Sequence, residues 1–199
     1  MVYEKTVLLE RTLWNHFQND DNRSKETLDL VHSDVCGPMP VKSLGGFLYY
    51  VTFIDVYSRK TWIYLLKAKD EIFDKFYEFK VVLENLTGRK IKILTSDNGG
   101  EYTSKIKILT SDNGGEYTWK DLVAFYKKVG IKRELVGPYI PQQNGVLEWK
   151  NRSIEEIVKA MMHDLDLLLF LWGEASQTTM YIRNKSPHKV LEGMTLEEV

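Results

Sequence analysis

The sequence has little of several features that define protein classes. It contains one cysteine, Cys36, which excludes an internal disulfide framework and a zinc site built from several thiolates. Its longest apolar run, residues 167–172, is six residues long, whereas a helix needs roughly 20 to span a bilayer. The formal net charge is −1, which alone gives no sign of nucleic-acid binding. These absences fit a globular protein of a reducing intracellular compartment, with no membrane segment.

The chain is long enough for one domain, with 199 residues of which 43% are hydrophobic. Residues 1–24 lack clear periodicity and end in a polar run, so we expect a poorly ordered N-terminal arm without a zinc finger. The core is expected over residues 25–185, followed by a truncated C-terminal extension over 186–199. Between residues 119 and 189, eleven Lys or Arg stand against eight Asp or Glu, a local basic excess.

Periodicity predicts a mixed α/β order of elements. Period-two and β-branched runs predict strands, and apolar residues three or four apart predict helices that stop at glycine or before proline. Strands are predicted over 28–34, 47–55, 61–66 and 131–136, and helices over 72–86, 122–129, 167–184 and from about 146 to 165. Together with one strand from the segment described next, these elements predict a central mixed five-stranded sheet flanked by helices.

An internal duplication dominates the middle of the chain. Residues 90–103 and 105–118 have the same sequence, KIKILTSDNGGEYT. Each copy begins with a strand-like run and continues into an acidic Ser-Asp-Asn-Gly-Gly-Glu-Tyr motif. The chain therefore holds two candidates, Asp97 and Asp112, for one carboxylate at the end of one strand. We call residues 90–103 copy one and residues 105–118 copy two.

Three acidic positions are expected to converge. Asp34 ends a predicted strand, Asp112 (or Asp97) ends another, and Glu148 lies in the first turns of a helix. Strand ends and helix starts can meet at one edge of an α/β sheet, and convergent carboxylates are ligands suited to Mg²⁺ or Mn²⁺. Two such ions can activate an attacking oxygen and stabilise the leaving oxygen of a phosphodiester. Taken singly, each acid is as easily explained as a turn residue, a cap or a solvated charge.

The motifs in combination resemble a known family. HSDVCGPMP, FIDVYSRKTWIYLLK, GRKIKILTSDNGGEYTS and GPYIPQQNGVLEWKNRSIEE, in this order, resemble the integrase catalytic core of copia-type LTR retrotransposons, from about residue 27 to about residue 198. The resemblance implies an RNase H-like fold and an Asp, Asp, Glu site for two Mg²⁺ or Mn²⁺ ions. Thirty-five residues lie between Asp112 and Glu148, the spacing typical of the family, whereas 50 lie between Asp97 and Glu148.

The resemblance also implies a reaction and partners. It implies 3′-end processing and strand transfer of element DNA into target DNA, catalysed by Asp34, Asp112 and Glu148. Double-stranded DNA, both element ends and target, is the implied partner, and a homo-oligomer is the implied active form. The implied location is a cytoplasmic particle and then the nucleus. Candidate DNA contacts lie near and along the Glu148 helix: Gln143, Asn144, Asn151, Arg152 and Lys159.

Two questions stay open on the sequence alone. The first is whether the chain is active or an inactive remnant that at most binds DNA or partner subunits, as the missing zinc segment and Trp149 in place of a cation would suggest. A nuclease without strand joining is a third reading. The second question is which copy forms the central strand. We expect copy two, with Asp112 in the site and residues 90–104 extruded or added as an edge strand.

Overall fold

Five strands form one mixed sheet in a computed structural model that describes residues 24–96, 125–135, 141–164 and 166–186. The strand order is β3-β2-β1-β4-β5. β1 pairs antiparallel with β2 and parallel with β4, while β3 is antiparallel to β2 and β5 is parallel to β4. The strands are β1 (Leu30–Cys36), β2 (Tyr49–Asp55), β3 (Thr61–Leu66), β4 (Ile93–Ser96) and β5 (Lys132–Leu135). The predicted five-stranded mixed sheet is therefore confirmed.

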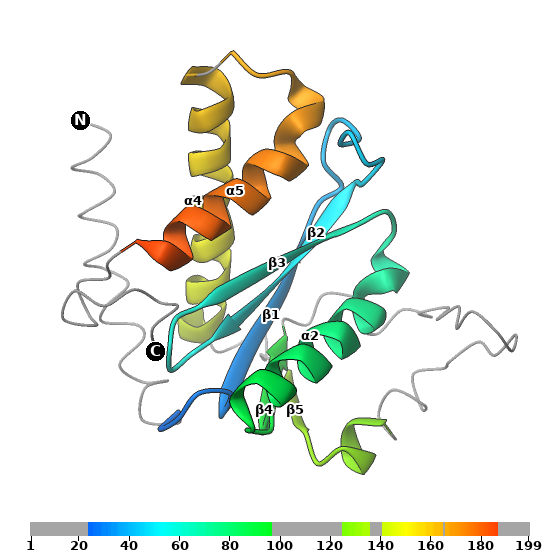
Figure 1. Cartoon of the computed structure of the whole chain (residues 1–199), viewed down its shortest axis with the longest axis vertical. Helices are drawn as coiled ribbons and strands as arrows, with labels where there is room; N and C mark the ends of the chain where they lie inside the picture. Colours follow the sequence, from blue (N-terminus) through cyan, green and yellow to red (C-terminus); the bar gives the residue numbers. More distant parts are fainter. Residues whose placement is uncertain (1–23, 97–124, 136–140, 165, 187–199) are drawn as a thin grey trace, which may run out of the picture.

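Helices cover both faces of this sheet (Figure 1). The helix α2 (Ile72–Thr87), preceded by the short helix η1 (Lys69–Glu71), packs on one face. On the other face lie α4 (Pro141–Asp164) and α5 (Trp172–Lys185), which are joined through η2 (Leu169–Leu171). The result is three layers with two hydrophobic clusters, one on each side of the sheet.

The alternation of β1 sends its residues to different layers. Val31 belongs to the cluster under α2, and Val35 packs against that cluster. Cys36 instead packs against the cluster formed with α4 and α5. Because successive strand residues point to opposite faces, Asp34 shares with Cys36 the face that is covered by α4. The strand periodicity thus decides which helices can approach Asp34.

The first long helix follows its predicted pattern closely. Phe76 and Phe79 of α2 are buried, and the ring of Phe79 stacks on Phe53 of β2 with centroids 4.5 Å apart. Gly88 ends the helix in the left-handed conformation, with φ of 67°, which glycine adopts without steric cost. The predicted helix over 72–86 is confirmed, although Leu86, expected on its buried face, is 78% exposed.

Two predicted boundaries were wrong. β1 does not end at Asp34, because Val35 and Cys36 continue the antiparallel ladder opposite Val51 and Tyr50 of β2. The helix α4 begins at Pro141, five residues before the predicted start near residue 146. Proline is well tolerated at the first helical position, since its missing N–H would be unpaired there anyway.

The expectation that copy two forms the central strand was also wrong. β4, between β1 and β5, consists of Ile93–Ser96 of copy one, so residues 90–96 are neither extruded nor an edge strand. Only residues 88–92 connect α2 to this strand, whereas copy two would need a connection about four times as long, at a cost of about 1.2 kcal/mol. Arg89, which precedes copy one, also pairs with Glu26, while Ser104 precedes copy two.

A buried carboxylate fixes the entry into β4. Glu84 of α2, with 5% of its side chain exposed, lies 2.8 Å from the ammonium groups of both Lys80 and Lys90. Its other oxygen accepts a hydrogen bond from the Ile91 backbone N–H at 3.1 Å. Burial would raise the pKa of Glu84, but these hydrogen bonds outweigh it and hold the pKa below its ordinary value of 4.5. The carboxylate therefore joins the end of α2 to the chain that enters the sheet.

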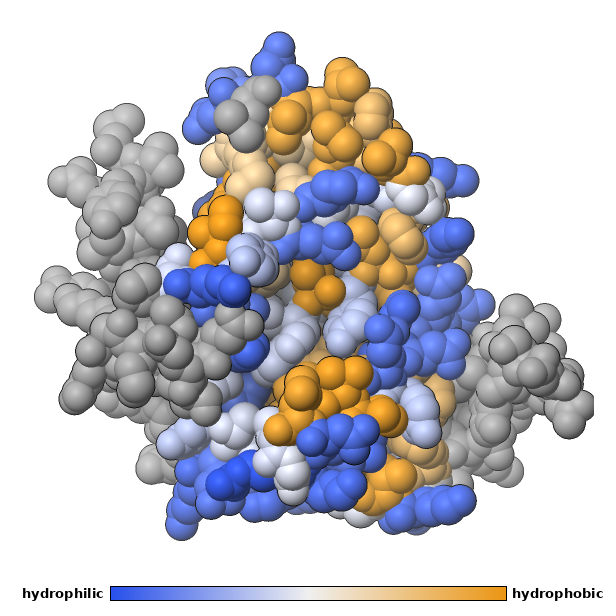
Figure 2. Space-filling model, in the orientation of Figure 1, coloured by the Kyte–Doolittle hydropathy of each residue, from blue (hydrophilic) through white to orange (hydrophobic). Residues whose placement is uncertain are grey.

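The surface carries apolar residues at one end of the molecule. Figure 2 shows them, in orange, where α4 turns into α5. Leu44, Leu168 and Leu169 are each more than 60% exposed there, and the Leu44 N–H bonds to the Phe170 carbonyl at 2.8 Å. Within the described ranges, no helix combines the length and apolar character needed to cross a membrane. The arm and extension predicted for residues 1–24 and 186–199 lie almost wholly outside these ranges and stay predictions.

A matched pair of substitutions tests which copy is in β4. Leu94 is 1% exposed in the cluster under α2, so Leu94→Ala should lower the free energy of unfolding by about 2–5 kcal/mol. Leu109 is the equivalent residue of copy two, and Leu109→Ala should cost far less. Urea denaturation of both variants measures the difference. Equal losses, or a larger loss for Leu109→Ala, would show that copy two takes the strand position.

The pH dependence of stability tests the role of Glu84. Because its pKa in the folded protein lies below 4.5, the carboxylate stabilises the fold above about pH 4.5, and this contribution is lost as the pH falls through the folded-state pKa. Glu84→Gln should cost about 1–3 kcal/mol at pH 7, and its difference from the unmutated protein should shrink toward pH 3 in urea denaturation.

Glu78→Gln is the control for this prediction on the same helix. Glu78 lies 2.8 Å from Lys75 with 52% of its side chain exposed, and exposed pairs contribute little. Its substitution should leave stability nearly unchanged at every pH. A Glu84→Gln effect that does not vary with pH would contradict the assigned role.

Candidate functional site

Asp34 lies on the central strand of the sheet. It is partly exposed, opposite Thr52 of β2, and its neighbour Ser33 pairs with Ser96 of β4 on the other side. One carboxylate oxygen accepts the Val35 backbone N–H at 2.8 Å, and the Thr52 hydroxyl donates to the Asp34 carbonyl at 3.4 Å. A partly exposed carboxylate in the middle of a sheet, with its backbone fixed on both sides, is well placed to serve as a rigid ligand.

The second carboxylate is predicted to follow β4. Since β4 ends at Ser96, Asp97 is the next residue in the chain, while Asp112 comes fifteen residues later. Both Asp97 and Asp112 lie outside the described residues. The choice between them as a site residue therefore stays a prediction, although the strand before Asp97 is now known to be the one beside β1.

The third carboxylate belongs to α4. Glu148 lies within this helix, whose backbone is described from Pro141 to Asp164, although the Glu148 side chain is outside the described part. The first described side chain that links α4 to β1 is Glu155, whose Oε1 accepts a hydrogen bond from the Cys36 Sγ at 2.9 Å. Glu155 is seven residues after Glu148, or about 10.5 Å along the helix on nearly the same face.

Cys36 and His32 share the strand face of Asp34 but do not add a nucleophile or an exposed ligand. Burial, and then the hydrogen bond and the negative charge of Glu155, raise the pKa of the Cys36 thiol to about 12. The thiol is therefore protonated at neutral pH and acts as a donor rather than as a nucleophile. His32 is 1% exposed, as expected for a packed histidine.

The predicted DNA contacts lie along α4. Gln143, Asn144 and Asn151 are helical residues whose side chains are outside the described part. Arg152 is 79% exposed and pairs with Glu156 at 3.2 Å, and Lys159 is 73% exposed and pairs with Glu155 at 3.2 Å. Both ion pairs are within one helix and open to solvent, so each is weak. The two cations are therefore available to an incoming phosphate at little cost.

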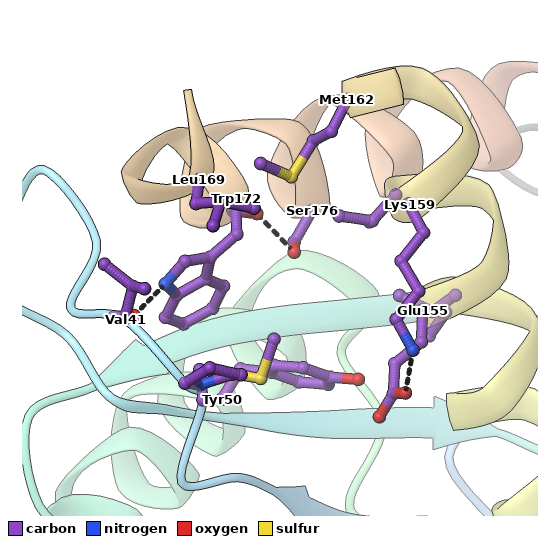
Figure 3. A pocket seen from close by; sticks show the side chains of 12 residues that line it. Val41, Tyr50, Glu155, Lys159, Met162, Leu169, Trp172 and Ser176 are labelled. Carbon is purple, nitrogen blue, oxygen red and sulfur yellow. Dashed lines mark hydrogen bonds and ion pairs between the residues drawn. The ribbon is translucent and has the colours of Figure 1, made fainter. Parts of the chain in front are cut away.

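A pocket of about 150 Å³ lies beside this helix (Figure 3). It is bounded by α4, α5, β2 and the chain after β1, and the Trp172 indole N–H fixes one wall by donating to the Val41 carbonyl at 2.8 Å. Most of its lining is apolar, from residues such as Met39, Val158 and Met162. Such a lining does not suit a phosphodiester, although Glu155 and Lys159 of α4 are also among the lining residues.

Sequence reasoning missed two carboxylates that organise the region. Glu155 was not singled out, because its partner Cys36 is 119 residues away. Asp55 was given no role either, yet it is fully buried and accepts hydrogen bonds from the Leu28 N–H and from Ser58. The Asp-x-x-Ser spacing at a strand end is a turn signal that could have identified Asp55.

The described side chains include one of the three predicted ligands of a divalent metal ion. Within the described ranges, no three His, Cys, Asp or Glu side chains come together to hold one. Of the three predicted ligand positions, only Asp34 has a described side chain, and a partly exposed carboxylate is the hard oxygen donor that Mg²⁺ prefers. Two further carboxylates would complete a site of the predicted chemistry.

The chain resembles parts of retrotransposon polyproteins. Residues 25–106 match the integrase core domain family. The chain is 46% identical over 171 residues to the retrovirus-related Pol polyprotein from transposon TNT 1-94 of Nicotiana tabacum, which covers 86% of this chain and 12% of the polyprotein. It is 30% identical over 176 residues to that from transposon RE2 of Arabidopsis thaliana, covering 88% and 11%. The chain thus spans about an eighth of the length of these curated relatives.

Solved integrase structures share the fold. The HTLV-2 integrase catalytic core domain in complex with magnesium (trimeric form) gives a TM-score of 0.57 at 16% identity, covering 89% of this chain and 99% of that one. The simian T-cell lymphotropic virus intasome in complex with PP2A regulatory subunit B56 gamma gives 0.61 at 15% identity, covering 88% and 55%. Residues 25–106 thus match the integrase core domain family, the chain is similar to parts of plant copia-type retrotransposon Pol polyproteins, and its fold is RNase H-like.

Proposed function

We propose that this domain catalyses metal-dependent processing of DNA 3′ ends and their transfer into a target DNA, as a homo-oligomer. The observation that supports this most is the position of Asp34. It lies on the strand face that α4 covers, and the adjacent strand β4 ends one residue before an aspartate. The integrase core domain family match supports the same reaction class.

The proposed division of labour follows from the residue types. Asp34, a second aspartate and Glu148 would hold two Mg²⁺ or Mn²⁺ ions, which supply activation of the attacking oxygen and stabilisation of the leaving oxygen. Asp34 contributes rigidity, since its backbone belongs to the central strand. Gln143, Asn144, Asn151, Arg152 and Lys159 would contact the DNA. Their role is to position the phosphodiester in line with the attacking group.

The second aspartate has two candidates with different support. The occupancy of β4 by copy one favours Asp97, because it directly follows Ser96, which pairs with Ser33 next to Asp34. The spacing of 35 residues to Glu148 favours Asp112. We therefore propose that one of the two is the ligand, and we take Asp97 first since backbone placement acts directly on the site.

A second function, an inactive remnant that at most binds DNA or partner subunits, is favoured by one specific observation. With copy one in β4, the fifteen extra residues of the duplication fall on the C-terminal side of this strand, between Ser96 and α4. That is the side on which the second carboxylate is expected. A fold with all its strands is compatible with such an insertion, whereas catalysis requires ligands held within about 0.5 Å.

Carboxylate substitutions separate these possibilities. In a Mg²⁺-dependent strand-transfer assay with duplex element ends, Asp34→Asn and Glu148→Gln should each reduce the rate by about 100-fold or more, since ligand loss removes several kcal/mol of transition-state stabilisation. If Asp97 is the ligand, Asp97→Asn should have the same effect and Asp112→Asn little.

The reverse pattern for Asp97→Asn and Asp112→Asn would assign Asp112. An unmutated chain that is folded by circular dichroism but inactive with Mg²⁺ and Mn²⁺ would identify the remnant. Activity that survives Asp34→Asn would reject the proposed site itself.

The salt dependence of DNA binding tests the α4 contacts. Arg152→Gln should weaken binding to duplex DNA of any sequence and lower the slope of log K against log salt by about 0.9, the value for one phosphate contact. Fluorescence anisotropy at several salt concentrations measures this slope. Lys75→Gln removes a cation from α2, on the opposite face of the sheet, and should leave the slope unchanged. Equal slopes for the unmutated protein and Arg152→Gln would exclude this contact.

A further inference from the structure

Two kinds of contact join α4 to the sheet, namely an apolar cluster and a hydrogen bond to β1. Ile154 and Val158 of α4 are buried in the cluster with Tyr50 of β2. These apolar contacts set which face of α4 meets the sheet, since a large rotation would expose Ile154 and Val158, but they are not directional. The hydrogen bond from Cys36 Sγ to Glu155 Oε1, at 2.9 Å, is directional, so it adds a preferred orientation of α4 within that face.

The Glu155 carboxylate is held at both oxygens. Oε1 accepts from Cys36, and Oε2 lies 3.2 Å from the Lys159 ammonium one turn later in α4. Figure 3 shows the Lys159 side chain reaching toward Glu155 along the helix. The Lys159 contact is open to solvent and weak, and the carboxylate is 31% exposed rather than fully solvated. The Cys36 contact is therefore the one that orients this acceptor toward β1.

Helix and strand geometry carry this contact to the proposed site. Glu148 precedes Glu155 by seven residues, which is about 10.5 Å along α4 with an angular offset of about 20°. Asp34 precedes Cys36 by two residues, which is about 6.6 Å along β1 on the same face. Glu155 thus lies on nearly the same helix face as Glu148, and Cys36 lies on the same strand face as Asp34. A rotation of α4 by one residue, about 100°, is already opposed by the burial of Ile154 and Val158, whereas a smaller rotation would lengthen the contact and shift the Glu148 position.

We propose that Glu155 and Cys36 form a positioning pair that sets the rotation of α4 and so brings the Glu148 position to the Asp34 side of β1. The pair touches neither substrate nor metal, so its residues are positioning residues rather than catalytic ones. The inference rests on the proposed function of Asp34 and Glu148. It adds a requirement outside the three carboxylates, namely a thiol donor on β1 and a carboxylate acceptor on α4.

Disruptive and conservative substitutions in the full chain test the pair. Cys36→Ala and Glu155→Leu remove the donor and the acceptor, whereas Cys36→Ser and Glu155→Gln retain them. The disruptive variants should raise the Mg²⁺ concentration for half-maximal strand transfer by about 10-fold. The KM for DNA should stay constant. The conservative variants should recover most of this loss. Cys36→Ala combined with Glu155→Leu should be no worse than either alone, because both remove one contact.

Two controls separate positioning from stability. Asp164→Leu removes an exposed carboxylate from the end of the same helix, where Asp164 is 78% exposed, and should change neither the Mg²⁺ dependence nor kcat. Amide hydrogen exchange, measured without DNA or metal, should become faster over residues 141–152 in Cys36→Ala and Glu155→Leu but not in Asp164→Leu. A purely structural role would lower Tm and reduce activity in the disruptive variants without changing the Mg²⁺ dependence.

The outcomes distinguish this inference from the proposed function. If the unmutated chain has no Mg²⁺-dependent activity, the proposed function fails, and the exchange data alone then decide whether the pair orders α4. If the unmutated chain is active but Cys36→Ala and Glu155→Leu retain its Mg²⁺ dependence, its kcat and its exchange over 141–152, the pair is overturned while the proposed function stands.

Discussion

The parallel pairing of β4 with β1 is the constraint on which the rest of the structure depends. β4 joins the antiparallel half of the sheet to β5, and α4 follows β5 in the chain. The pairing is secured from outside the sheet, since the Glu84 carboxylate holds Lys90 and the Ile91 N–H, and the Lys92 N–H bonds to the Leu28 carbonyl at 3.1 Å. If copy two formed this strand, the strand order would be unchanged, but the residues that follow the strand would differ.

The two faces of the sheet divide the work of the domain. On one face, Phe53, Phe76 and Phe79 make a cluster of aromatic contacts that needs no polar partner. On the other, Asp34 and Cys36 come from the same strand as the buried Val31 but meet α4. Stability is thus concentrated under α2 and the proposed chemistry under α4. The period of two along β1 produces this separation, because each step along the strand changes the face.

Elements of the fold were predictable from the sequence where the pattern that specifies them lies within a few neighbouring residues. The third strand was predicted with the bounds of Thr61–Leu66, and α2 to within one residue, because periodicity and Gly88 are local signals. The choice of copy one could not be read from periodicity, since both copies have the same local preference and only connection length and Arg89 differ. The spacing of 35 residues to Glu148 favoured copy two, but such a spacing exerts no force on folding. The contact of Cys36 with Glu155 joins residues too far apart for any local pattern.

The duplication therefore acts differently on stability and on activity. Placing the extra residues after β4 costs little free energy, because the entropy of a loop grows only with the logarithm of its length, by about 0.6 kcal/mol for each doubling. The sheet and both clusters form regardless of it. An insertion next to a proposed ligand can have a much larger effect on the reaction rate, since a displacement of about 1 Å can reduce a rate by about 100-fold. A chain can thus keep all five strands of this sheet while an insertion after β4 displaces a proposed ligand that follows the strand.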